Sequence, residues 1–241
     1  MLQPARFIKR LHRFGAEIEI NGQHHTAHMP NPGRMRELLV PDARIFVLHA
    51  PSPHRKTAYS LLAVEYNGLL VSLDSTLPNR FMPEMIGNSL FPPFEHCHVT
   101  GREITFEDSR LDLAAECNGK KVLIEIKSCT LVENGHAMFP DAPTTRGARH
   151  MNTLAMAVEQ GYRAASVIVV QRPDAVCFSP NRLTDPAFDQ AYWHAVDAGV
   201  EPWVIVTRPT LFRTLEFVSY FGRERISRLP DGGFTKDFSC R

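Results

Sequence analysis

Alternating apolar and polar positions run through the first third of the chain and predict a series of short strands. Asn21-Gly22 and Asn67-Gly68 separate neighbouring runs, and both residue types tolerate the positive φ that a tight hairpin turn requires. Short strands joined by such turns are typical of small barrels, so we predict an OB-like β-barrel over residues 1–77. The expected strands cover residues 13–20, 24–29, 44–49, 57–66 and 69–73.

After residue 77 the pattern changes to helices that alternate with strands. Helical spacing is expected over residues 78–88, 144–160 and 185–198, and apolar strands are expected over 99–106, 163–170 and 203–207. Gly161 and Gly199 follow two of these helices, at the position where glycine commonly ends a helix. The alternation predicts a mixed-sheet α/β domain over residues 78–241. The chain has 241 residues, of which 44% are hydrophobic, enough to bury the core of one large or two small domains.

A hairpin around Asn118-Gly119 carries the candidate chemistry. If Cys117 faces Lys120, the same register places Asp112 opposite Glu125 and Arg110 opposite Lys127. Residues two apart share a face of a strand, so the charged side chains project together. The opposite face is expected to carry Leu111, Leu113, Ala115, Val122, Ile124 and Ile126.

Two carboxylates that face each other across strands repel unless something compensates them. Mg²⁺ or Mn²⁺ bound by Asp112 and Glu125 would compensate them, since Mg²⁺ is commonly held by one or two carboxylates with water and phosphate oxygens. Lys127 would then position an attacking water molecule. The alternative is an exposed hairpin on which Arg110 and Lys127 form ordinary ion pairs with the acids. Both interpretations fit the spacing.

Charge is distributed unevenly along the chain. The formal net charge is +1, but residues 1–60 contain nine basic and four acidic residues, a net charge of +5, which leaves −4 for the remainder. A basic barrel beside a carboxylate cluster is typical of an enzyme that binds a phosphate backbone at one place and attacks it, through a metal, at another. The alternative is a solvated charged surface. The candidate contacts are Arg13, Phe14, Arg34, Arg36, Arg55 and Lys56.

Several short motifs occur along the chain in a fixed order. They are Asn31-Pro32-Gly33-Arg34-Met35, Arg55-Lys56, Pro78-Asn79-Arg80, Ser109-Arg110-Leu111-Asp112, Ile124-Glu125-Ile126-Lys127-Ser128, Phe139-Pro140-Asp141-Ala142, Arg146-Gly147 and His150. Asp112 followed by Glu125-x-Lys127 resembles the PD-(D/E)xK nuclease core. The whole set resembles the SfsA family (sugar fermentation stimulation protein A) in the same order. The resemblance weakens before about Arg6 and after about Arg208, and Pro32 stands where the family usually has threonine.

The resemblance implies an OB-like DNA-binding domain followed by a PD-(D/E)xK nuclease-like domain. We therefore expect a protein that binds DNA largely without sequence preference and hydrolyses phosphodiester bonds with Mg²⁺, using Asp112, Glu125 and Lys127. Glu84 is the expected third metal ligand, with Glu103 as its competitor. The alternative is a non-catalytic DNA-binding regulator of sugar metabolism that retains the scaffold. A further phosphate contact is expected at the start of the helix after residue 144, from Arg146, Arg149 and His150.

Other features bear on compartment and assembly. Residues 1–10 lack the apolar segment of a secretory signal, and no apolar run approaches membrane-spanning length, so we expect a cytoplasmic protein without a membrane partner. The cysteines have no paired spacing and are expected to be reduced thiols. A homodimer is also considered, because nucleases that cut both strands often pair two active sites. The cysteines are Cys97, Cys117, Cys129, Cys177 and Cys240.

Overall fold

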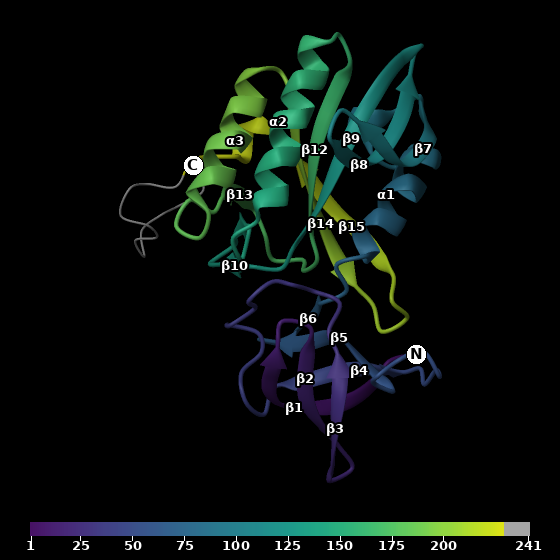
Figure 1. Ribbon diagram of the computed structural model, residues 1–241, viewed down its shortest axis with the longest axis vertical. Coiled ribbons are helices and arrows are strands. Elements are labelled where there is room, and N and C mark those ends of the chain that lie inside the picture. The colour runs from purple at the N-terminus through teal and green to yellow at the C-terminus, as the bar shows by residue number, and fades with distance from the viewer. Residues whose placement is uncertain (229–241) are drawn as a thin grey trace.

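The computed structural model describes residues 1–228 and places a β-barrel below an α/β domain (Figure 1). The barrel is built from the N-terminal strands, and all helices longer than one turn among the described residues lie in the second domain. A hairpin of β14 (Glu201–Pro209) and β15 (Leu215–Phe221) reaches down toward the barrel. Leu211 at its tip packs against an apolar cluster that includes Leu2 and Phe46.

Five strands close the barrel, which confirms the predicted OB-like architecture. The strands pair in the order β1-β2-β3-β5-β4-β1, and a sixth strand, β6, extends the sheet as a hairpin with β5. Asn21-Gly22 and Asn67-Gly68 adopt positive φ at their turns, as predicted. The strands are β1 (Gln3–His12), β2 (Gly15–Ile20), β3 (Gln23–His28), β4 (Arg44–His49), β5 (Tyr59–Tyr66) and β6 (Leu69–Ser72).

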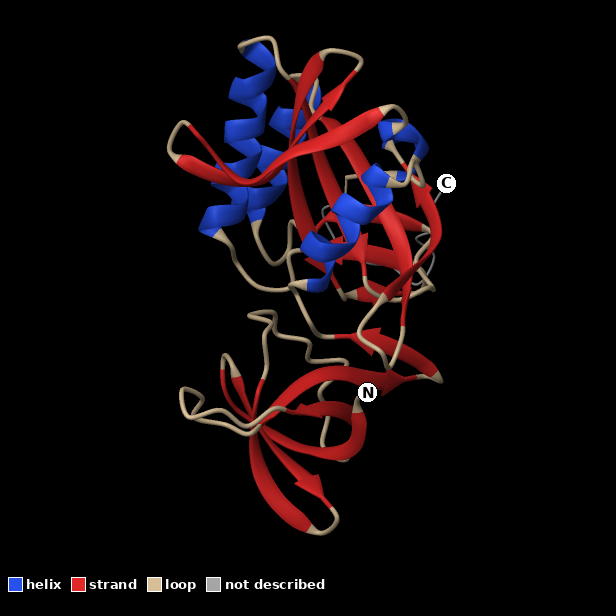
Figure 2. Cartoon of the chain, turned by 90° about the vertical axis from the view of Figure 1, so that its right-hand side faces the viewer, coloured by secondary structure: helices blue, strands red, loops and turns tan. Residues whose placement is uncertain are grey.

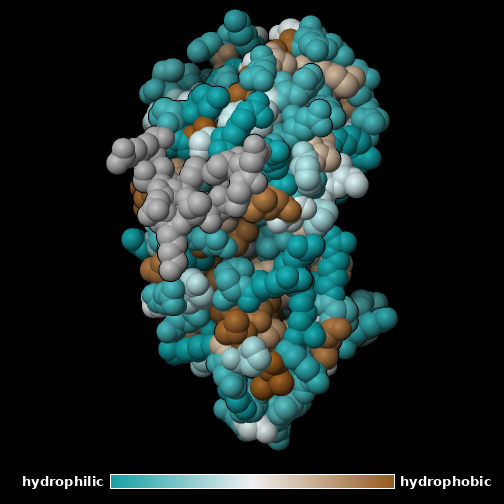
Figure 3. Space-filling view, turned by 90° about the vertical axis from the view of Figure 1, so that its left-hand side faces the viewer, coloured by the Kyte–Doolittle hydropathy of each residue, from teal (hydrophilic) through white to brown (hydrophobic). Residues whose placement is uncertain are grey.

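Strand β1 was not predicted, because its sequence lacks a clean apolar alternation. Phe7 is its only buried residue, and register shifts interrupt its pairing with β2 on both sides of Lys9 and Arg10. Pairing with both β2 and β4 nevertheless holds it in the barrel. Apolar side chains from the strands fill the interior of the barrel. On the face of the molecule shown in Figure 3, most of the surface is formed by hydrophilic side chains. The core includes Phe7, Ile18, Val47, Leu61 and Val71.

The second domain contains a mixed sheet, as predicted, and helices cover both faces of this sheet (Figure 2). Its strand order is β15-β14-β12-β9-β8-β7, in which β9, β12 and β14 are parallel and the outer pairings are antiparallel. Within residues 1–228 no helix combines the length and apolar character needed to cross a bilayer. The other elements of this sheet and its helices are α1 (Leu77–Gly87), β7 (Cys97–Phe106), β8 (Ser109–Cys117), β9 (Lys120–Cys129), α2 (Thr145–Glu159), β12 (Arg163–Val170) and α3 (Pro186–Asp197).

Several elements have no counterpart in the prediction. The short strands β10 (Val132–Glu133), β11 (His136–Phe139) and β13 (Cys177–Pro180) form a small separate sheet beside α3, and β15 extends the main sheet. Strands β10, β11 and β13 are two to four residues long, too short for a periodic pattern to stand out, whereas β15 is exposed at five of its seven positions and has no continuous buried face. Two single-turn 3₁₀ helices complete the described chain, at Pro92–Phe94 and Arg223–Arg225.

The hairpin of β8 and β9 has the predicted register over part of its length. Cys117 pairs with Lys120 and Leu113 with Ile124, and Asn118 and Gly119 have the positive φ of the expected turn. The prediction is wrong beyond Leu113, where the ladder ends and Asp112 does not pair with Glu125. Instead, the Asp112 carboxylate accepts the N–H of Ile126 at 2.8 Å and takes the place of a backbone acceptor.

The divergence of the two strands also moves the neighbours of Asp112. Arg110 pairs with Thr105 of β7 and its side chain lies 3.6 Å from Glu103, away from Lys127. Leu111 packs in the cluster beneath α2, whereas Leu113 packs in the cluster beneath α1. The expectation that Arg110 joins the charged set and that Leu111 shares a face with Leu113 is therefore wrong.

The cysteines require a further correction. Cys97 on β7 and Cys117 on β8 face each other across the two strands and form a disulfide. Their separation of 20 residues gave no signal, because only the antiparallel pairing of β7 and β8 brings them together. Cys129 is a buried free thiol, and Cys240 lies outside the described residues. The cysteines thus no longer argue for a reducing compartment.

Candidate functional site

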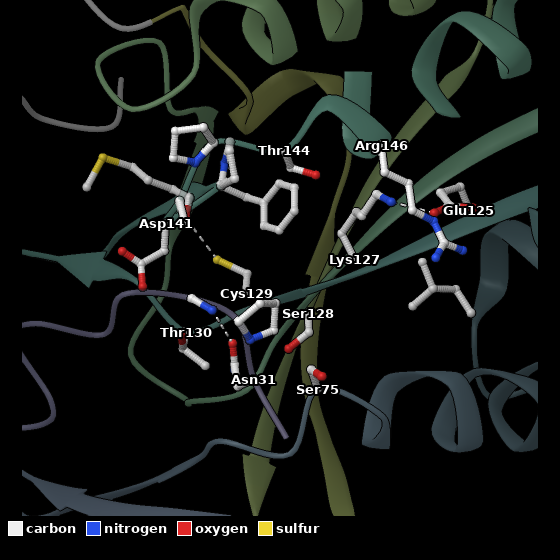
Figure 4. Close-up of a pocket in the computed structure, with 18 of the residues that line it drawn as sticks. Asn31, Ser75, Glu125, Lys127, Ser128, Cys129, Thr130, Asp141, Thr144 and Arg146 are labelled. Atoms are coloured by element: carbon white, nitrogen blue, oxygen red, sulfur yellow. Dashed lines mark hydrogen bonds and ion pairs between the residues drawn. The ribbon is translucent and has the colours of Figure 1, made fainter. Parts of the chain in front are cut away.

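A cavity of about 340 Å³ lies where the barrel meets the α/β domain. One wall is the C-terminal half of β9, and the others come from the loop after β3, the start of α1, and the segment between β11 and α2. In Figure 4, Lys127, Glu125 and Arg146 lie together at one side, while Asn31, Thr130 and Asp141 lie at the other. Asp112, Glu125 and Lys127 all line the cavity, so the structure brings the three predicted catalytic residues together.

Glu125 is the most deeply buried charged group of this cavity, with 2% of its surface exposed. Its Oε1 accepts hydrogen bonds from Lys127 Nζ and His150 Nδ1, and its Oε2 is buried without a protein partner. Burial acts to raise the pKa of Glu125, but Lys127 and His150 outweigh it and hold the pKa below the ordinary value. Glu125 is therefore an ionised carboxylate with one oxygen free.

Asp112 is held by two hydrogen bonds. Asn79 Nδ2 on α1 donates to its Oδ1 at 2.8 Å, and the N–H of Ile126 donates to its Oδ2 at 2.8 Å. Burial and the charge of Glu125 raise the pKa of Asp112 to about 6, against the opposing effects of Ile126, Lys127 and Asn79. The two acids thus share one environment in which both being ionised is costly.

The third predicted metal ligand does not reach this site. Glu84 is exposed on α1 and does not line the cavity, and Glu103 is exposed beside Arg110. Across residues 1–228 no group of three or more His, Cys, Asp or Glu side chains is close enough to hold a metal. The placement of Glu84 follows from the helical period, because the buried face of α1 is formed by its apolar residues and Glu84 lies on the opposite face.

The basic residues of α2 are placed differently from one another. Arg146 lines the cavity, Arg149 is exposed and does not line it, and His150 is 1% exposed. His150 bonds Glu125 through Nδ1 and accepts from Arg146 Nε at Nε2, 3.2 Å away. His150 therefore faces the carboxylate, and the prediction that it presents itself to a phosphate is wrong.

The basic residues of the barrel fall into two groups. Arg13 lines the cavity, and Arg10 holds the neighbouring loops by donating to the carbonyls of Arg13, Gly33 and Arg34 at 2.7 Å each. Arg34 and Arg36 are exposed on the loop that follows β3, which contributes Asn31, Pro32 and Gly33 to the cavity.

The second group lies between β4 and β5 and does not line the cavity. Arg55 donates to the carbonyl of Ala50 at 2.9 Å and to Ser60 Oγ at 2.6 Å, so it holds its own loop, and Lys56 is exposed. Phe14, the predicted aromatic contact, is exposed, and the guanidinium carbon of Arg13 lies over its ring, 5.3 Å from the ring centroid.

One connection between the barrel loop and the α/β domain was not foreseen. Asp141 Oδ2 accepts the N–H of Met35 at 2.5 Å, which ties the barrel loop to the segment before α2. Gly33 lies between the side chains of Asn31 and Asp141, since a Cβ at this position would lie 3.0 Å from Asn31 Oδ1 and 3.1 Å from Asp141 Oδ2. Asn79 and Asp141 stand in motifs that sequence singled out, but only the fold assigns them partners.

Comparison with known proteins agrees with this architecture. The family model "SfsA N-terminal OB domain" matches residues 8–73, and "Sugar fermentation stimulation protein RE domain" matches residues 76–211. A sugar fermentation stimulation protein homolog of Alkaliphilus metalliredigens is 48% identical over 197 residues, covering 81% of this chain and 85% of the relative. A homolog of Desulforamulus reducens is 39% identical, covering 83% and 84%.

A solved structure is similar over nearly the whole chain. It is described as the structure of Pyrococcus furiosus SfsA in complex with Ca²⁺, and it matches with a TM-score of 0.85 and 30% identity. The match covers 94% of this chain and 96% of the other. The barrel followed by a mixed-sheet domain is therefore an arrangement that this solved structure shares.

Proposed function

This chain belongs to the SfsA family, and we propose that it is a DNA-binding nuclease that hydrolyses phosphodiester bonds with Mg²⁺ or Mn²⁺. The observation that carries the proposal is the convergence of Asp112, Glu125 and Lys127 in one cavity between a basic barrel and the α/β domain. The match of residues 76–211 to a model named for an RE domain supports the same class of activity.

The residues present fit a hard divalent cation. Glu125 Oε2 is a buried carboxylate oxygen without a protein partner, and burial together with the charge of Glu125 raises the pKa of Asp112. Two carboxylates are the usual protein contribution for Mg²⁺, which keeps water and phosphate oxygens as its other ligands. The Pyrococcus furiosus relative is described in complex with Ca²⁺, which also takes oxygen ligands. Mg²⁺ bound here would neutralise charge that develops on the phosphate.

Lys127 has the position to orient the attacking water. Its ammonium is anchored on Glu125 Oε1 and lines the cavity, and it has two further N–H donors for a water oxygen or a phosphate oxygen. In the reaction, the water oxygen bonds to phosphorus and gives up a proton to solvent, the P–O bond to the leaving oxygen breaks, and that leaving oxygen takes up a proton from solvent. Arg146, on the same side of the cavity, supplies positive charge for the phosphate.

DNA binding is proposed to use the mouth of the cavity. Arg10 fixes the loops that carry Arg13 and Arg34, so the two cationic side chains extend from a braced backbone. Contacts of this kind bind phosphates and carry no base information. Binding is therefore expected to be largely independent of sequence and to weaken steeply as salt rises.

The test compares near-isosteric variants under identical conditions. Asp112→Asn, Glu125→Gln and Lys127→Met should each lower the rate of Mg²⁺-dependent cleavage of labelled single- and double-stranded DNA by about 100-fold or more. Binding of the same DNA, measured by fluorescence anisotropy in Ca²⁺, should change less than about threefold. Glu84→Gln is the matched control, because an exposed acid outside the cavity should leave cleavage unchanged.

Three outcomes would contradict the proposal in whole or in part. Cleavage that persists equally in all three variants identifies a contaminating nuclease, and DNA binding without cleavage in the parent favours the non-catalytic regulator. If the parent protein does not detectably bind DNA at low salt, the proposal of DNA binding is wrong as well. A cytoplasmic location and a homodimer stay predictions.

A further inference from the structure

His150 lies between two groups of the proposed site, and we propose that it is a positioning residue that holds the Glu125 carboxylate and the Arg146 guanidinium together. The inference rests on the proposed function, in which Glu125 binds the metal and Arg146 contacts the phosphate. His150 itself is 1% exposed and does not line the cavity, so it acts through its two neighbours.

The hydrogen bonds of His150 define its protonation pattern. Arg146 Nε lies 3.2 Å from His150 Nε2, and a guanidinium is always a donor. Nε2 must then be the acceptor, so the ring proton sits on Nδ1 and is donated to Glu125 Oε1. The arrangement is a neutral imidazole that accepts from the arginine and donates to the carboxylate.

The first consequence concerns which oxygen of Glu125 is available. His150 and Lys127 both donate to Oε1, and Oε2 is buried without a partner. The side chain is therefore fixed with one oxygen satisfied and the other free for the metal. Hydrogen-bonding partners that orient a metal ligand typically contribute 10- to 100-fold to metal affinity.

The second consequence concerns Arg146. Arg146 and His150 are four residues apart and share one face of α2, near the helix start, where the Thr144 hydroxyl accepts the N–H of Gly147 at 2.9 Å. The bond from Nε to His150 restrains a side chain that is otherwise exposed. Its terminal nitrogens remain available to a phosphate beside Glu125 and Lys127 (Figure 4).

Two amide substitutions separate these roles. In His150→Asn the amide nitrogen falls near the position of Nδ1 and preserves the donor to Glu125, whereas in His150→Gln the amide oxygen falls near Nε2 and preserves the acceptor for Arg146. Mn²⁺ affinity, measured from the free-ion EPR signal, should stay within about threefold of the parent in His150→Asn and fall about 10-fold or more in His150→Gln. The KM for DNA at saturating Mn²⁺ should rise several-fold in His150→Asn and change little in His150→Gln.

Thr153→Val is the matched control, because it removes a buried hydrogen bond between α2 and Ser109 without contacting Glu125. It should leave both Mn²⁺ affinity and KM unchanged, and equal effects in all three variants would overturn the inference by identifying general disturbance of α2. In the metal-free parent, ¹⁵N NMR of the imidazole should show the proton on Nδ1, and a proton on Nε2 alone would also overturn it. A parent that binds no Mn²⁺ would refute the proposed function, and the NMR result would still decide the inference.

Discussion

Replacing Asp112 by asparagine should stabilise the metal-free protein at neutral pH. The folded protein raises the pKa of Asp112 to about 6, against an ordinary value of 3.8. Between these values the folded state binds more protons than the unfolded state, so the free energy of unfolding falls as pH rises. Above about pH 6 the carboxylate is ionised in both states and the whole penalty is present. The amide side chain of the asparagine variant cannot ionise, so the variant does not carry this penalty.

The size of the expected stabilisation follows from the pKa shift of Asp112. A difference of about 2 pKa units corresponds to about 3 kcal/mol at 1.36 kcal/mol per unit. The new amide can keep both hydrogen bonds of Asp112, because its oxygen accepts the Ile126 N–H and the Asn79 amide can turn to present its oxygen. A gain of about 3 kcal/mol raises the Tm of a chain of this size by roughly 6–12 °C.

The assay is urea unfolding in EDTA, followed by circular dichroism at several pH values. The variant should be more stable by about 3 kcal/mol at pH 7.5, and the difference should shrink toward zero near pH 4. Glu116→Gln, on the same strand but outside the cavity, is the control and should change stability by less than about 0.5 kcal/mol. Adding Mg²⁺ should stabilise the parent and narrow the gap, since only the parent retains both carboxylates. A variant no more stable than the parent at pH 7.5, or a gap independent of pH, would refute the reasoning.

Three further predictions concern neighbouring features. Gly33→Ala should destabilise the protein by about 1–3 kcal/mol in urea unfolding and weaken DNA binding in anisotropy, because a Cβ would lie 3.0 Å from the side-chain oxygen of Asn31; unchanged values would show that the loop has room. Reducing the Cys97–Cys117 disulfide should lower the free energy of unfolding by about 3 kcal/mol, because the unfolded chain loses the restraint on a loop of 20 residues, and Cys97→Ser should remove this part of the response to reductant. Burial raises the pKa of Cys129 to about 12, so native protein should resist alkylation there at pH 8 by peptide mass spectrometry while urea-unfolded protein reacts; rapid native labelling would contradict its burial.

The local sequence determined the hairpin of β8 and β9, which bears the residues of the site. Asn118 and Gly119 determine a turn with positive φ at both positions, and the turn sets the register of the residues next to it. The sequence therefore placed Asp112 and Glu125 on neighbouring strands and Lys127 beyond them, and all three line one cavity. The prediction failed where the ladder ends, since a side-chain carboxylate replaced a backbone acceptor there.

Longer connections were decided only by the tertiary structure. Strand β1 needs β2 and β4 on either side, and the Cys97–Cys117 bond needs the pairing of β7 with β8. The partners of His150 come from β9 and from the preceding turn of α2, and the sequence indicated only that it lies near a basic helix start.

The division has a physical reason. Turn chemistry and strand alternation depend on φ, ψ and side-chain direction over a few residues, so the sequence alone determined the barrel strands with clean alternation, the hairpin and the helix periods. Which carboxylate oxygen is free, which arginine faces the cavity and which cysteines meet depend on how helices and sheets pack over tens of residues. The tertiary structure alone decided these, because burial changes the pKa and the partners of a side chain without leaving a local pattern.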